Sequence, residues 1–160
     1  MFMHRREFTA FLPALLAATA LLPETATAQQ LGSATAPPAK TKGPLPEILS
    51  GVYPPGPATG SGGRTGHRYL AGMLKAGNIQ IEMHETRQEP GTPHEAIGHH
   101  LHNEIWLVRE GICELTTNGV TRRMVAGDVG ICCAGDLHYV ANAGDTPCSY
   151  FVVTVGPPEP

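Results

Sequence analysis

From His67 to Gly156, short apolar runs alternate with turn residues, and apolar positions show no helical spacing. The runs are rich in β-branched, aromatic and aliphatic residues, which is typical of strands. Between two of them, Asn118-Gly119 predicts a two-residue type I′ hairpin. The pattern predicts eight strands: Arg68–Lys75, Ile79–Thr86, Glu104–Arg109, Ile112–Thr117, Val120–Val125, Val129–Cys133, Leu137–Ala141 and Cys148–Val155. We therefore expect residues 66–156 to form an all-β jelly-roll barrel, also called a double-stranded β-helix.

One predicted strand is apolar on both faces. A strand with one face in water alternates apolar and polar residues, but Ile105–Val108 does not. We expect the outward side chains, Ile105 and Leu107, to be covered by a second subunit, giving a homodimer, or by the proline-rich arm at residues 29–65. Trp106 shares the inner face with Glu104, where it walls a pocket or belongs to the core.

Candidate metal ligands lie on two of the strands. Alternate strand residues face the same way, so His100, His102 and Glu104 share a face if their strand extends back to His100. His138 begins a later strand after the turn at residues 134–136. Imidazole nitrogens and a carboxylate that converge from two strands form a ligand set for one divalent metal ion.

These residues fall within two spaced motifs. Histidines precede Glu104, and Gly111 follows it at the spacing E-x6-G. The second motif, spaced G-x5-P-x-G-x2-H-x3-N, comprises Gly127, Cys133 at the proline position, Gly135, His138 and Asn142. The pair resembles the two motifs of the cupin superfamily. That resemblance implies that the motifs face each other inside the barrel and hold one metal ion.

The first motif departs from the family pattern, which has two histidines ahead of the glutamate. Counting back from Glu104 gives His100 as the second histidine and Gly98 at the place of the first. With the longer spacer, His99 is second and Ile97 stands at the first place. We favour His100, His102, Glu104 and His138 as ligands, with His99 or His94 as alternatives to His102.

The resemblance implies a metal-dependent enzyme, dioxygenase-like or isomerase-like, that acts on a small organic substrate. The alternatives are a non-catalytic module that binds a metal or small ligand, and a metal-free barrel. We expect iron or manganese, with zinc, nickel or copper possible by ligand type.

The first 28 residues have the layout of an export signal. Arg5-Arg6 precedes an apolar run, and small residues at positions 26 and 28 suit cleavage before Gln29. The arginine pair resembles a bacterial twin-arginine signal. A membrane anchor is the alternative, but the apolar run is short and is interrupted by Pro13 and Pro23. We expect a periplasmic or secreted bacterial protein without a stable membrane span.

Residues 29–65 are rich in proline and glycine and predict a linker or arm, while residues 157–160 form a tail. The apolar residues at positions 48, 49, 52 and 53 either dock on the barrel or a partner, or belong to a free tether. The formal net charge of −3 and the absence of a basic cluster argue against a nucleic-acid partner.

The four cysteines are Cys113, Cys132, Cys133 and Cys148. An even number of cysteines in an exported protein is typical of disulfide bonding. A chain that folds in the reducing cytoplasm before export favours buried free thiols instead. Neighbouring strand residues point to opposite faces, which argues against a bond between Cys132 and Cys133.

Overall fold

The computed structural model describes residues 45–159 of the 160-residue chain. All of the eight predicted strands are present there, and a short additional strand precedes them. The strands are β1 (Thr59–Ser61), β2 (Arg64–Leu74), β3 (Ile79–Gln88), β4 (Asn103–Glu110), β5 (Ile112–Thr117), β6 (Val120–Val125), β7 (Val129–Cys132), β8 (His138–Asn142) and β9 (Cys148–Gly156). Residues 45–159 contain no helix capable of spanning a membrane.

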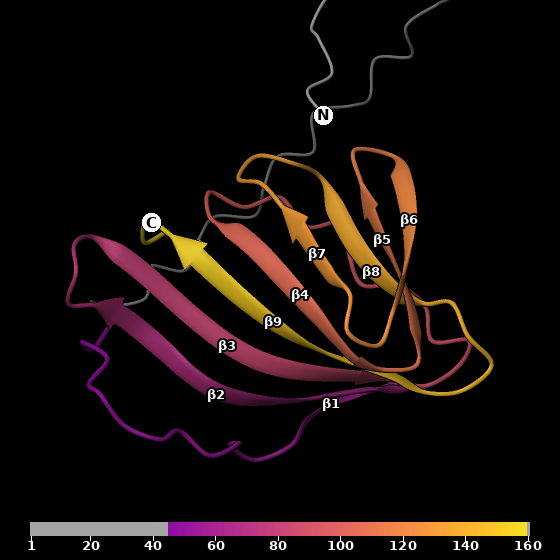
Figure 1. The fold of residues 1–160 in the computed structure, drawn as a ribbon, viewed down its shortest axis with the longest axis horizontal. Coiled ribbons are helices and arrows are strands. Elements are labelled where there is room, and N and C mark those ends of the chain that lie inside the picture. Colours follow the sequence, from indigo (N-terminus) through magenta and orange to yellow (C-terminus); the bar gives the residue numbers. More distant parts are fainter. Residues whose placement is uncertain (1–44, 160) are drawn as a thin grey trace, which may run out of the picture. The chain divides into compact units, whose positions relative to one another are not determined.

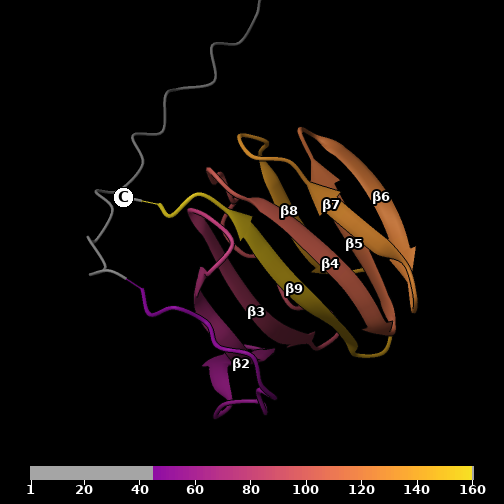
Figure 2. The ribbon, with the colours of Figure 1, turned by 60° about the vertical axis from the view of Figure 1, so that its left-hand side comes forward.

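The strands form two antiparallel sheets, which confirms the predicted all-β fold (Figures 1 and 2). One sheet has six strands in the order β1-β2-β3-β9-β4-β7, and the other has three in the order β6-β5-β8. Alternate residues of β4 and β9 face β5, β6 and β8 across the core, because apolar burial favours packing the two inner faces together. This core consists of Trp106, Val108, Cys113, Leu115, Met124, Cys132, Val140, Cys148, Tyr150 and Val152.

A tight turn joins β5 to β6 at the predicted position. Asn118 and Gly119 have φ values of 48° and 79°. Positive φ at both central residues is the requirement of a type I′ turn, so the hairpin prediction is confirmed.

The segment before β1 lies along the edge of β2. Ile48 N–H donates to the carbonyl of Met73 at 2.8 Å, and Met73 N–H donates to the carbonyl of Pro46 at 2.8 Å. Further along, Gly56 N–H donates to the carbonyl of Arg68 at 2.8 Å. Residues 46–56 therefore dock on the barrel and satisfy backbone groups at an otherwise open sheet edge. Residues 1–44, which include the predicted signal, lie outside the described part of the chain.

The outward face of β4 and β7 stays exposed. Leu107 is 43% exposed, Val129 63% and Ile131 57%. Residues 46–56 lie at the β2 end of the six-stranded sheet, whereas β7 is its other end strand. The described part of the arm therefore does not cover this face.

All four cysteines are free thiols in the structure. Cys113, Cys132 and Cys148 are buried and Cys133 is exposed. Cys132 and Cys133 thus point to opposite sides of the sheet, as strand geometry requires.

Candidate metal centre

The candidate site lies where the start of β4 meets the start of β8. Glu104 is the second residue of β4 and His138 the first of β8. The segment before β4 is held against β8 by Gly98, whose N–H donates to the carbonyl of His138 at 2.7 Å. In return, His138 N–H donates to the carbonyl of Gly98 at 3.1 Å. Gly135 of the preceding turn donates its N–H to the carbonyl of His100 at 2.8 Å, so both motifs meet through backbone contacts.

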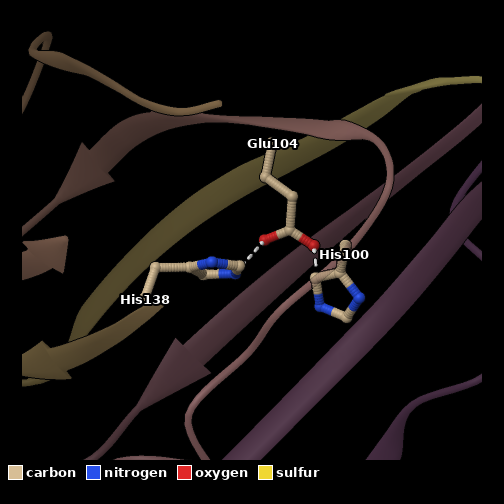
Figure 3. A group of neighbouring side chains, drawn as sticks. All are labelled: His100, Glu104 and His138. Carbon is tan, nitrogen blue, oxygen red and sulfur yellow. Dashed lines mark hydrogen bonds and ion pairs between the residues drawn. The ribbon is translucent and has the colours of Figure 1, made fainter. Parts of the chain in front are cut away.

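The three predicted histidine ligands lie around the carboxylate of the fourth predicted ligand, Glu104. Glu104 Oε2 is 3.1 Å from His138 Nε2, and Glu104 Oε1 is 3.3 Å from His102 Nε2. The more distant His100 Nε2 is 3.7 Å from Glu104 Oε1. Figure 3 shows His100, Glu104 and His138 pointing toward one another. His100, Glu104 and His138 each offer a ligand atom within 4.8 Å of the others.

Gly98, at the place of the missing family histidine, leaves room beside these imidazoles. A Cβ at this position would lie 2.6 Å from His138 Nε2 and 3.2 Å from His100 Nε2. A glycine is therefore needed for the backbone to approach the cluster this closely. The space and the donor types, neutral imidazole nitrogen and carboxylate oxygen, fit a divalent first-row metal ion.

The protonation pattern of His138 suits it to ligation. Its Nδ1 lies 3.1 Å from the carbonyl oxygen of Asp136 and 3.1 Å from Cys132 Sγ. Because a carbonyl only accepts, this contact favours a proton on Nδ1, which would leave Nε2, 3.1 Å from Glu104 Oε2, as the nitrogen that binds a metal ion. Trp106 packs beside this ring, with 5.5 Å between ring centroids, and is 2% exposed, so it is a core residue that also walls the site.

His100 stays in the neutral form that metals bind. Burial lowers its pKa, and the positive charge that His102 and His138 can carry lowers it further. The carboxylates of Glu104 and Glu159 oppose this shift. A lowered pKa keeps the imidazole uncharged at neutral pH.

Glu159 is a site residue that the sequence analysis missed. Its Oε1 is 2.9 Å from His102 Nδ1 and accepts a hydrogen bond from Leu101 N–H at 2.8 Å. His100, His102 and Glu159 form a second group with ligand atoms within 4.8 Å of one another. No motif spacing marks Glu159, because it lies in the tail beyond β9.

The two alternative histidines lie apart from this cluster. His99 is exposed. His94 is also exposed and stacks on Tyr139, with 4.0 Å between ring centroids. The structure thus brings His100, Glu104 and His138 into one group, while His102 belongs to the second group with His100 and Glu159, and the assignment of all four as ligands stays a prediction.

Comparisons with known proteins agree with this fold. A family model described as "Cupin domain" matches residues 84–154. The chain is similar to an RmlC-like cupin from Shewanella frigidimarina, with a TM-score of 0.52 and 14% identity over 64% of this chain and 83% of that one. It is also similar to plu4264 protein from Photorhabdus luminescens, with a TM-score of 0.50 and 17% identity over 61% of this chain and 79% of that one.

A salicylate 1,2-dioxygenase from Pseudoaminobacter salicylatoxidans has a TM-score of 0.50 and 20% identity over 61% of this chain, but only 26% of that chain. No curated protein matches the chain. The family match, the two facing antiparallel sheets and the paired motifs that meet between them identify residues 84–154 of this chain as a cupin domain.

Proposed function

We propose that this protein is a metal-dependent cupin enzyme, dioxygenase-like or isomerase-like, that acts on a small organic substrate in the cell envelope. The observation that carries the proposal is the convergence of His100, Glu104 and His138 on the inner side of the barrel. The fold alone does not choose a reaction, since one fold hosts many activities. A dioxygenase among similar folds is compatible with the proposal and supports no more than that.

The chain's own residues would hold the ion and set its surroundings. His138 and His100 would bind through imidazole nitrogens and Glu104 through a carboxylate oxygen. The carbonyl of Asp136 orients His138, and Glu159 orients His102 through its Nδ1. A bound ion with open positions would supply Lewis-acid chemistry and, if it is iron, chemistry with oxygen.

The first test is the metal content of the purified protein. We expect about one iron or manganese ion per chain, since a few imidazole and carboxylate ligands form one site. His138→Ala and Glu104→Gln should each remove most of the metal, measured by elemental analysis. His99→Ala changes an exposed histidine outside the cluster and serves as the matched control. Equal metal content in all four proteins would refute the site.

A non-catalytic binding module is the second candidate function. It is favoured by Gly98 at the place of a family histidine, which leaves a smaller ligand set. Oxygen uptake by the metal-loaded protein with a panel of small organic acids separates the two. Binding of an acid without oxygen uptake or chemical change of that acid would favour the module.

The proposed location rests on the first 28 residues. Small residues at positions 26 and 28 suit a signal peptidase, so we expect the exported form to begin at Gln29. Mass spectrometry of the protein from the periplasm or medium measures the first residue of the exported form directly. A variant with both Arg5→Lys and Arg6→Lys should stay in the cytoplasm. An exported form that retains Met1 would instead favour an anchor.

A further inference from the structure

A second polar cluster lies on the inner face of the six-stranded sheet, away from the four predicted ligands. A hollow of about 500 Å³ is lined by residues of β2 and β3 and by Gly56, Pro57, Thr59 and Gly60. We call it the β2–β3 hollow. Its charged and polar lining residues include Arg64, Arg68, Glu82, His84 and Thr86.

The strand register places this lining on the same face as the core. Arg68 is paired with His84, and His84 with Val152 of β9. In the neighbouring row, Thr86 is paired with Tyr150. Val152 and Tyr150 are core residues, and paired residues of adjacent strands point to the same side. The hollow therefore continues the inner surface that carries Glu104 and Trp106.

The polar groups around the hollow have more donors than acceptors. Arg64 Nε and His84 Nδ1 are buried and have no hydrogen-bond partner among the described residues. Glu82 Oε1 is 3.1 Å from Arg68 Nη2, and its 3.4 Å contact with His84 Nδ1 lacks hydrogen-bond geometry. Arg64 Nε can only donate, and His84 Nδ1 donates in the tautomer that carries its proton there. A buried donor without an acceptor is costly, so the cluster is short of an acceptor at Arg64 Nε.

The charges indicate what that acceptor is. Contact with His84 and with the guanidinium of Arg68 lowers the pKa of Glu82 against the effect of burial, so Glu82 is ionised. Two arginines and one ionised carboxylate leave one net positive charge. A monoanion matches this charge, whereas a phosphate dianion would also be repelled by Glu82. A carboxylate can moreover accept two hydrogen bonds from one guanidinium.

The hollow lies within reach of the candidate metal centre. Thr154 of β9 is paired with Glu82 on one side and with Glu104 on the other. Two strand spacings separate Glu82 from Glu104, which is about 10 Å between their backbones. A small organic acid is long enough to lie across this distance.

We propose that the β2–β3 hollow binds the carboxylate of a small organic acid whose other end extends toward His100, Glu104 and His138. The carboxylate contacts Arg64, Arg68 and His84. The direction of the other end rests on the proposed function, whereas binding of the carboxylate does not.

Binding of benzoate to the purified, metal-depleted protein tests the carboxylate site. Arg64→Met and Arg68→Gln should each raise the dissociation constant about tenfold or more, because each removes a charged hydrogen bond. Benzamide, the neutral analogue, should bind more weakly than benzoate and respond little to either change. Arg122→Gln, on β6 and outside the hollow, is the matched control.

Two outcomes would overturn the site. Unchanged benzoate binding in both arginine variants excludes the hollow, and tighter binding of inorganic phosphate than of benzoate excludes a carboxylate preference. The side chain of Arg68 is 62% exposed, so Arg68→Gln should fold even if Arg64→Met does not. Thermal unfolding of both variants checks this.

Manganese loading separates this inference from the proposed function. In the wild type, bound Mn²⁺ should speed the relaxation of the protons of bound benzoate. In His138→Ala this faster relaxation should disappear, while the affinity for benzoate should stay the same. Benzoate binding that depends on Arg68 in a protein that holds no metal would refute the proposed function and retain the carboxylate site. Metal binding without relaxation of the bound benzoate would refute the direction of the ligand.

Discussion

At the scale of single residues, two adjacent cysteines have opposite environments. Cys132 is 2% exposed and lies 3.1 Å from His138 Nδ1, whereas Cys133 is exposed. Burial raises the pKa of Cys132 to about 11, and the negative charges of Asp136 and Glu104 add to the effect. Because the thiolate is the reactive form, Cys132 stays an unreactive thiol at neutral pH.

We therefore expect one fast-reacting thiol per native chain in a titration with a thiol reagent at pH 8. Cys133→Ser should abolish it, and the reaction of Cys132 should quicken only as the pH rises toward 11. Cys113 and Cys148 are buried as well and should react only after unfolding. Two or more fast thiols in the native chain would contradict this assignment.

At the scale of elements, the β5–β6 turn supports the start of β8. Asn118 Nδ2 donates to Asp136 Oδ1 at 2.7 Å, and Asn118 Oδ1 accepts from Leu137 N–H at 3.0 Å. These bonds connect one hairpin to the turn that carries His138. Asn118→Gly keeps the positive φ but removes both bonds, so it should lower the free energy of unfolding by about 1 kcal/mol.

Asn118→Ala separates the side-chain bonds from the backbone conformation. It should cost about 1 kcal/mol more than the glycine variant, because alanine is strained at a φ of 48°. Urea unfolding measures both differences. Equal stability of the two variants would contradict the role of the turn conformation, and wild-type stability in both would contradict the role of the bonds.

At the scale of the whole molecule, the outward face of β4 and β7 indicates self-association. Leu107, Val129 and Ile131 form an exposed apolar surface, and β7 is an end strand of its sheet. Among the described residues, the outer edge of β7 pairs with no other strand. Open edges and apolar surfaces favour contact with a second copy. We expect a homodimer, with twice the chain mass in light scattering.

Ile131→Glu should shift the protein toward a monomer, because it places a charge in this surface. Val120→Glu is the matched control, since Val120 is 51% exposed on β6, in the other sheet. If the wild type is a monomer, the outward face of β4 and β7 would instead be covered by residues 29–44 of the arm. Deletion of these residues should then expose the face and cause aggregation.

Much of this architecture could be predicted from the sequence. Strand alternation and turn residues depend on neighbours a few positions apart, so local patterns located β2 to β9 and the turn at Asn118. Same-face parity likewise predicted that His102 and Glu104 lie together, and motif spacing added His138. These features follow from short-range geometry and from the sequence alone.

Only the tertiary structure decided which distant residues meet. Glu159 reaches His102 because β9 ends beside the start of β4, where Val155 is paired with Asn103. Arg68 faces His84 because of the β2–β3 register. Sheet order and register depend on packing between two sheets, and a slip of one residue would turn each side chain to the other face. Local patterns contain no information on such long-range contacts. The sequence therefore predicted the strands and the central residues of the candidate site, while the fold decided the position of Glu159 and of the β2–β3 hollow.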